Sequence, residues 1–324
     1  MLLFPLVSLA LVVPGEDDVR SAIDRSLPLL VRSVEEYPKH RDCFSCHHQA
    51  APMLALATAR SRGLKVPDEA FSAIVDVTMQ DLNSALTVYR EIKGQGGGAT
   101  RAGYALWALD LGGKKADETT QAVTQFLLGR DEDAGPWKTS SNRPPSEFSP
   151  FTTTYVALRG LRAYASQGDT ARMDARRRKV SDWLKATPAK ETEERVFRLL
   201  SLHALGDEKE AQEAAQELLR HQKEDGGWSQ LDGADSASDA YATGSTLYAL
   251  HTAGALPSSS DAYRRGLAHL VRTQREDGSW YVKSRSKPFQ PYFESAFPHG
   301  KDQFIAIAAS SWATTALLLA LPTP

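Results

Sequence analysis

Six short segments of small and apolar residues recur along the chain, and each lies in a stretch that is apolar on nearly every side. The segments are residues 52–56 (PMLAL), 105–109 (ALWAL), 157–161 (ALRGL), 201–205 (SLHAL), 246–250 (TLYAL) and 313–317 (ATTAL). A helix that is apolar all round is a buried helix. The pattern therefore predicts six inner helices.

More polar segments with helical periodicity lie between these stretches. They are residues 17–36, 68–93, 118–130, 170–185, 208–222 and 261–274. In residues 208–222, Ala211, Ala215 and Leu218 belong to one apolar stripe, and Glu and Gln residues occupy the opposite face. The pattern predicts six amphipathic outer helices, and no segment alternates as a strand does. Six inner and six outer helices form an all-α, α/α toroid, in which each repeat buries its apolar face only against its neighbours.

The connections between these helices differ in length according to direction. Turns from an inner to an outer helix are mostly short, whereas loops from an outer to an inner helix are mostly long. The long loops are residues 37–46, 94–100, 131–150, 223–240 and 275–303. Because repeat proteins place insertions on one face, often the binding face, we expect these loops to surround one mouth. The inner helices also begin there, so their N-terminal dipoles favour anionic or carbonyl groups at the mouth.

Charge and hydropathy narrow the class of protein. Lys and Arg number 38 against 40 Asp and Glu, a balance that excludes a generally basic nucleic-acid binder. No uninterrupted apolar run reaches the roughly 18 residues of a membrane span. The apolar block at residues 2–13, followed by an acidic stretch, is typical of a signal peptide. We expect residues 1–15 to be that peptide and residues 16–324 to be one toroid domain. The protein would then be exported to a periplasmic or extracellular location. The alternative for the apolar block is a buried helical turn or a wrong start codon.

Two loops carry a motif that resembles a known superfamily. Residues 222–228 (QKEDGGW) and 274–280 (QREDGSW) resemble the Gln/Trp motif of the squalene cyclase and protein prenyltransferase superfamily. Residues 131–137 (DEDAGPW) resemble a degenerate third copy, with Asp131 in place of the Gln. The resemblance covers the chain behind the apolar block and implies a toroid of the terpenoid cyclase type. It also implies that these motifs are structural, with the Gln closing an outer helix and the Trp packing over it.

The same resemblance bears on catalysis. Squalene cyclases use an Asp-x-Asp-Asp run at the mouth, where one protonated carboxyl attacks an alkene. The corresponding residues 236–241 (SASDAY) keep one carboxylate, Asp239, which is the candidate acid of a cyclase-like reaction because burial can raise the pKa of a carboxyl. Protein prenyltransferases hold zinc with Asp, Cys and His late in the barrel. Here the last cysteine is Cys46, so prenyltransferase activity is not expected.

The motif Cys43-Phe-Ser-Cys46-His47 is the sharpest chemical feature of the sequence. C-x-x-C-H is the attachment signature of a c-type haem, in which both cysteines form thioethers and the histidine ligates iron. We therefore expect a covalent haem at the mouth. Four alternatives stay open: a structural disulfide, a zinc site of Cys43, Cys46 and His47 or His48, an unmodified thiol pair, and an internal thioester. The thioester would join Cys46 and Gln49, whose spacing resembles that in the toroids of the complement and macroglobulin family.

The loop at residues 287–303 (KPFQPYFESAFPHGKDQ) is the second candidate segment. Its length, aromatic residues and prolines favour a functional loop over a simple connection. In a closed ring the sixth repeat packs beside the first, so we expect His299 near His47, where it could be the second axial ligand of the haem iron; a solvated loop histidine is the alternative. Further side chains are expected at the mouth: His48, Arg101, Tyr104, Tyr241, Tyr292 and Glu294. Three tryptophans, Trp137, Trp228 and Trp280, are expected around its rim.

Three functions are compatible with these features. The leading hypothesis is a redox or electron-transfer role at a haem, with a redox protein as partner. The second is an enzyme that acts on a hydrophobic, terpenoid-like small molecule with Asp239 as the acid. The third is a non-catalytic toroid that binds a ligand, with a structural Cys43–Cys46 pair.

Overall fold

The structure is a computed structural model that describes residues 13–287 and 291–323. The described residues contain helices and loops without a strand, apart from one isolated bridge between Arg143 and Glu147. The predicted all-α class is therefore confirmed. Most of the predicted signal peptide lies outside the described residues.

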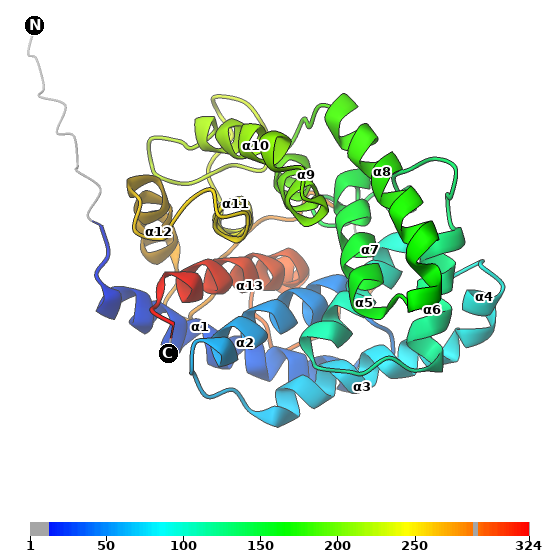
Figure 1. Cartoon of the computed structure of the whole chain (residues 1–324). Helices are drawn as coiled ribbons and strands as arrows, with labels where there is room; N and C mark the ends of the chain where they lie inside the picture. Colours follow the sequence, from blue (N-terminus) through cyan, green and yellow to red (C-terminus); the bar gives the residue numbers. More distant parts are fainter. Residues whose placement is uncertain (1–12, 288–290, 324) are drawn as a thin grey trace, which may run out of the picture.

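Six inner helices form a closed ring (Figure 1). They are α2 (Ala51–Ser61), α5 (Gly98–Leu111), α7 (Pro150–Tyr164), α9 (Thr192–Leu205), α11 (Ala240–Thr252) and α13 (Gln303–Ala320). Each helix contacts the next one in this order, and α13 contacts α2. The predicted toroid is confirmed, with the sixth repeat beside the first.

The outer layer agrees with the predicted segments except at one place. Its helices are α1 (Glu16–Glu36), α3 (Asp68–Ser84), α4 (Leu86–Arg90), α6 (Glu118–Gly129), α8 (Thr170–Ala186), α10 (Glu208–Arg220) and α12 (Asp261–Thr273). The predicted helix at residues 68–93 is divided at Ala85, whose φ of −114° and ψ of 14° leave the helical conformation. The short α4 then packs on α6, where the ring of Tyr89 lies 5.3 Å from that of Phe126. Tertiary packing overrides a local pattern that is helical on both sides of the break.

The tryptophans of the three Gln/Trp loops occupy the same place in each repeat. Each indole N–H donates to a carbonyl near the end of the preceding outer helix, at 2.8 Å in every case: Trp137 to Leu127, Trp228 to Leu218 and Trp280 to Leu270. All three side chains are at most 1% exposed. The expectation that they surround the mouth was wrong, because they close helix ends inside the protein, as the resemblance implied for the motif.

The glutamines of the two complete motifs join neighbouring outer helices. Gln222 donates to Gly226 in its own loop and to the Ala262 carbonyl of α12. Gln274 donates in the same way to Gly278 and to the Ala22 carbonyl of α1. A motif glutamine thus links the last outer helix, α12, to the first, α1, by the same hydrogen bond that links α10 to α12. The outer layer therefore closes as the inner ring does.

Helix α13 is enclosed by its neighbours. The segment Gly300–Ala320 is long and apolar enough to cross a membrane by length and composition, but 83% of its most apolar window is buried inside the protein. It contacts α1, α2, α11 and α12. Its apolar character is therefore accounted for by its place in the inner ring, where other helices cover it.

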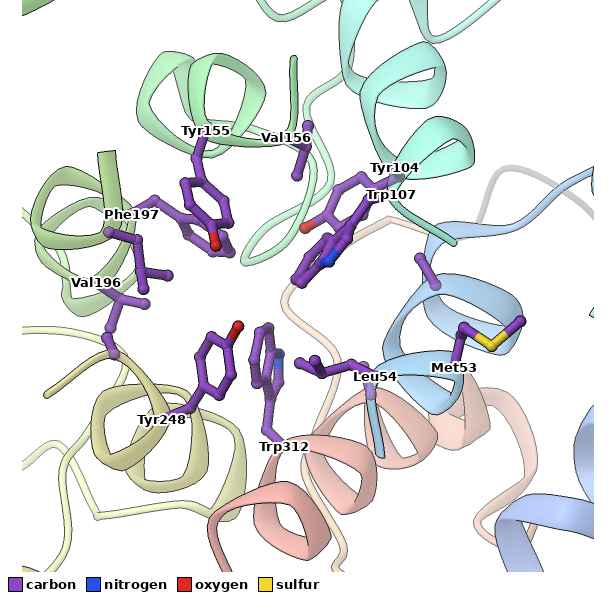
Figure 2. Packing of buried hydrophobic residues seen from close by; sticks show 14 of the residues in the cluster. Met53, Leu54, Tyr104, Trp107, Tyr155, Val156, Val196, Phe197, Tyr248 and Trp312 are labelled. Atoms are coloured by element: carbon purple, nitrogen blue, oxygen red, sulfur yellow. The ribbon is translucent and has the colours of Figure 1, made fainter. Parts of the chain in front are cut away.

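Aromatic side chains from the inner helices meet around the axis of the ring (Figure 2). They are Trp107, Tyr155, Phe197, Tyr248 and Trp312, with contacting ring centroids 5.2 to 6.5 Å apart. We call this set the aromatic belt. Tilted and edge-to-face aromatic pairs at such distances stabilise a core beyond the burial of their area.

Candidate functional site

A pocket of about 530 Å³ opens at the end of the ring where the inner helices begin. Its walls come mainly from two of the long loops and from the first turn of α13. The lining residues are His47, Arg143, Pro144, Pro145, Ser146, Glu147, Lys283, Ser284, Ser286, Lys287, Tyr292, Lys301, Asp302, Phe304 and Ile305. We call this space the mouth pocket. Its location agrees with the prediction from loop length.

One wall of the mouth pocket holds a buried ion pair. The Glu147 carboxylate is 6% exposed and lies 2.6 Å from the guanidinium of Arg143. Burial raises the pKa of Glu147, and Arg143 partly offsets that shift. Cys46 lies behind this pair, where burial and the neighbouring Glu147 raise the pKa of its thiol. The thiol of Cys46 is therefore neutral rather than an activated thiolate.

The C-x-x-C-H segment forms the start of the first inner helix. Ser45 caps a single π-helical turn, Cys46–Ala50, by accepting a hydrogen bond from His48 N at 3.3 Å. The His47 ring packs 5.0 Å from that of Phe304 and lines the mouth pocket, and burial lowers the pKa of His47 to about 3. A neutral imidazole in this place acts as a donor and acceptor of hydrogen bonds.

The described arrangement does not fit a covalent haem. A c-type haem requires both cysteine sulfurs and the histidine to face one space. His47 lines the mouth pocket, but Cys43 and Cys46 do not, and Cys43 contacts the Tyr37 hydroxyl at 3.8 Å. A haem at this motif stays a prediction from the sequence.

The disulfide, thioester and zinc hypotheses for this segment are not supported by the described side chains. Both cysteines are free thiols, and the Gln49 side-chain oxygen accepts a hydrogen bond from Ser45 N. Across residues 13–287 and 291–323, no three His, Cys, Asp or Glu side chains form a group that could hold a metal ion.

The loop before α13 meets the first inner helix through Ser295 rather than His299. His48 Nε2 lies 2.8 Å from Ser295 Oγ. His299 Nε2 instead bonds Ser279 Oγ at 2.7 Å, and its ring packs on Tyr281. The reason is local, since His299 has a φ of 83° and turns the chain into the helical turn before α13. The repeats come together as expected, but the side chain that bridges them is a serine.

A second group of polar side chains is buried below the mouth pocket. Glu193 is 3% exposed, and its Oε1 accepts a hydrogen bond from Thr152 Oγ1 at 3.0 Å. Its Oε2 and the hydroxyl of Tyr241 meet no other hydrogen-bond partner among the described residues, and the interactions of Thr152 and Tyr241 with the carboxyl partly offset the effect of burial on its pKa. Burial raises the pKa of Glu193 to about 8. At neutral pH this side chain is therefore mostly the neutral carboxylic acid.

This acid lies one turn closer to the mouth than the aromatic belt. Glu193 precedes Phe197 by four residues on α9, so both side chains project from the same face. On α5, Tyr104 precedes Trp107 by three residues, which also places the two side chains on one face of the helix. The Tyr104 hydroxyl donates to the carbonyl of Ser146 at 3.4 Å, and Ser146 lines the mouth pocket. The buried acid thus lies between the pocket and the aromatic belt.

Asp239 has a structural task at the start of α11. Its Oδ1 accepts a hydrogen bond from Ala242 N at 3.0 Å and caps the helix. Burial raises the pKa of Asp239 to about 6. Compared with Glu193, this carboxyl is ionised to a greater extent at neutral pH and is held by a backbone N–H.

The remaining predicted mouth residues have different surroundings. Arg101 pairs with the buried Asp81. Tyr292 is 51% exposed, lines the mouth pocket and donates to Glu294 at 2.9 Å. Arg101 is therefore engaged in an ion pair, whereas Tyr292 is accessible to a ligand.

Sequence reasoning missed Glu193, Arg143, Glu147 and Ser295. A signal for Glu193 was present, because a carboxylate four residues before Phe197 breaks an otherwise apolar helix face. Arg143, Glu147 and Ser295 lie in loops, where periodicity carries no information about which side chains point inward.

Comparisons with known proteins agree with this fold. Residues 192–313 match the family model of the squalene-hopene cyclase C-terminal domain. The type II terpene cyclase MstE from Scytonema superposes with a TM-score of 0.58 and 14% identity, over 96% of this chain and 100% of that chain. A protein from Actinoplanes gives 0.58 and 16%, over 94% and 100%. The ent-copalyl diphosphate synthase from Streptomyces platensis gives 0.53 and 20%, over 84% and 50%.

MstE has also been solved with geranylgeranyl dihydroxybenzoate, its substrate. No curated protein matches the chain. The matched residues 192–313 include both Glu193 and Asp239. The chain thus has the α/α-toroid fold of the type II terpene cyclases, and its second half resembles the C-terminal domain of squalene-hopene cyclase.

Proposed function

We propose that this protein is an enzyme that protonates an isoprenoid-like alkene, with Glu193 as the Brønsted acid. The observation that carries the proposal is a buried carboxyl with its pKa raised to about 8, one helical turn from Phe197 of the aromatic belt. A carboxyl that stays protonated at neutral pH can deliver a proton where water is excluded. The redox role expected from the C-x-x-C-H motif is not part of this proposal.

The hydrogen bonds define which oxygen carries the proton. Thr152 donates to Glu193 Oε1, so the acidic proton resides on the other oxygen, Oε2, and the Tyr241 hydroxyl is the neighbouring polar group. The alkene takes this proton with its π electrons, which leaves a carboxylate on Glu193 and a carbocation on the substrate. A second alkene then attacks the cation, and loss of a proton or addition of water ends the reaction.

The aromatic belt suits the charged intermediate. Aromatic faces attract cations, by about 0.5–2 kcal/mol each and most strongly when desolvated. The aromatic belt, Trp107, Tyr155, Phe197, Tyr248 and Trp312, surrounds the axis of the ring (Figure 2). Phe197 lies one helical turn beyond Glu193 on α9. The isoprenoid substrate of MstE, a protein of the same fold, supports this substrate class.

Asp239 is the alternative acid, and two isosteric variants separate the candidates. Wild type, Glu193→Gln and Asp239→Asn are incubated in D₂O with squalene, geranylgeraniol and geranylgeranyl diphosphate, and products are analysed by mass spectrometry. We expect wild-type product to carry deuterium at the protonated carbon. Glu193→Gln should lose at least about 100-fold in rate, the lower range for a general acid, while Asp239→Asn keeps turnover. Turnover retained in Glu193→Gln would contradict the assignment, and loss only in Asp239→Asn would transfer the role to Asp239.

A further inference from the structure

A chain of hydrogen-bonded side chains begins at the mouth pocket and does not include Glu193. A chain of hydrogen bonds runs from the pocket into the protein: His47 Nδ1 to His48 Nδ1 at 2.7 Å, His48 Nε2 to Ser295 Oγ at 2.8 Å, and Ser295 Oγ to Gln303 Oε1. His48, Ser295 and Gln303 are fully buried, whereas His47 lines the pocket. The outer end of the chain is therefore the part that a ligand can reach.

The inner end of this chain sets the direction of every hydrogen bond in it. Gln303 Nε2 donates to the carbonyl of Phe293 at 2.6 Å, so its Oε1 must be the acceptor that faces Ser295. The single hydroxyl proton of Ser295 is used in that bond. Ser295 Oγ can then only accept from His48, which places the His48 proton on Nε2.

The same reasoning extends to the ligand-facing ring. With its proton on Nε2, His48 has a bare Nδ1, and the bond at that atom must be donated by His47 Nδ1. A neutral imidazole carries one ring proton, so Nε2 of His47 is the bare nitrogen. Ser45 Oγ lies 2.9 Å from Nδ1 and 3.2 Å from Nε2 of this ring. The chain thus fixes His47 as a hydrogen-bond acceptor at the pocket.

The charges of the pocket favour an anion. Glu147 is neutralised by Arg143, and Asp302 accepts from the Tyr281 hydroxyl and from Ser284 N, both at 3.0 Å. The lysines that line the pocket, Lys283, Lys287 and Lys301, are exposed and form no ion pair with a carboxylate among the described residues. Cations without partners beside a pocket create a field that attracts a negatively charged ligand.

The walls are apolar in part and are fastened together. Pro144, Pro145, Phe304 and Ile305 supply an apolar surface. Ser286 Oγ donates to the Pro144 carbonyl at 2.9 Å, which ties the loop before α13 to the loop before α7. A volume of about 530 Å³ is in the range of pockets that bind small molecules. The pocket is thus a built site rather than a gap between loops.

We infer that the mouth pocket binds a small amphipathic anion, a carboxylate or phosphate on an apolar body, which also donates a hydrogen bond from a hydroxyl to His47 Nε2. The lysines hold the anionic group, the prolines and Phe304 contact the apolar body, and the polarised chain supplies the acceptor. This inference does not rest on the acid chemistry of Glu193.

Matched probes test the three elements of recognition separately. Calorimetric titration compares ω-hydroxydecanoate with decanoate, which lacks the hydroxyl, and with decanediol, which lacks the anion; ω-hydroxydecyl phosphate tests the head group. We expect ω-hydroxydecanoate or its phosphate counterpart to bind about 5- to 10-fold more tightly than decanoate, a typical effect of one hydrogen bond. Decanediol should bind at least about 10-fold more weakly. Equal binding of all probes, or binding of none, would overturn the inference.

Variants and a spectroscopic measurement complete the test. His47→Phe should remove the preference for the hydroxylated probe, and Lys283→Ala with Lys301→Ala should remove the preference for the anion. Glu193→Gln and the distant Lys65→Ala should bind the probes as wild type does. A failure of Glu193 as the acid would therefore leave probe binding unchanged, and the two proposals can fail separately. In wild type, nitrogen NMR of His47 should show a proton on Nδ1 and a bare Nε2. A proton on Nε2 of His47 would overturn the assignment, and this measurement on wild type does not depend on how well a variant folds. An unchanged preference for the hydroxylated probe in folded His47→Phe would also overturn it.

Discussion

Replacing the buried acid Glu193 by glutamine should stabilise the protein at alkaline pH and have little effect at acidic pH. The pKa of Glu193 is about 8 in the folded protein, against an ordinary value of 4.5. Between these values the folded protein holds a proton that the unfolded chain has released, so the free energy of unfolding decreases as pH rises through this range. The full shift corresponds to about 4–5 kcal/mol above pH 8. Glutamine has nearly the same shape and does not ionise, so the variant lacks this loss.

Thermal unfolding of wild type and Glu193→Gln at pH 5 and pH 9 measures the effect. A folded chain of this size has an unfolding entropy near 0.65 kcal/mol/K, so 4 kcal/mol corresponds to a difference of roughly 6 °C in Tm. We expect the variant to unfold roughly 6 °C above wild type at pH 9 and within about 2 °C of it at pH 5. The exposed Glu213→Gln serves as the control and should show no such pH dependence. A pH-independent difference between Glu193→Gln and wild type would show that Glu193 ionises normally.

Two further predictions concern the fold and the cysteine motif. Trp228→Ala should lower the free energy of unfolding by about 3–5 kcal/mol, because the indole is fully buried and donates a hydrogen bond to the Leu218 carbonyl. Replacing the half-buried Trp183 by alanine should lower it clearly less in the same denaturant titration. Equal losses would contradict the structural role of the Gln/Trp loop. Protein produced in an oxidising compartment with haem-attachment machinery should have an unmodified mass, since Cys46 lies behind Glu147 and away from the mouth pocket. A haem-sized mass increase that Cys46→Ala removes would contradict that expectation and restore the redox hypothesis.

The architecture was predictable because the two layers of a toroid leave different patterns in the sequence: inner helices are apolar on every side, and outer helices have one apolar stripe. Residues 304–321 are apolar on every side because α13 is enclosed by α1, α2, α11 and α12. Residues 208–222 have one apolar stripe because α10 packs on α9 with a single face. Loop length then identified the mouth. The break at Ala85 was not predictable, since it depends on how α4 packs against α6.

The site was predictable only in outline. The sequence pattern placed the first and last repeats side by side but could not choose between Ser295 and His299, because the backbone turn at His299 decides which side chain points inward. Asp239 was singled out by its place in a family motif, and its capping of α11 became visible only in three dimensions. Glu193 stands on a helix face that periodicity marks as buried, so a search for a charged residue on such a face would have found it.

The central claim is that Glu193 is a neutral carboxylic acid inside the folded protein at neutral pH. Infrared difference spectroscopy between wild type and Glu193→Gln tests it without a substrate. The account predicts a carbonyl stretching band of one protonated carboxyl in wild type at pH 6, absent from the variant, which disappears as the pH rises through about 8. A spectrum that shows only the carboxylate bands of Glu193 at pH 6 would contradict the claim.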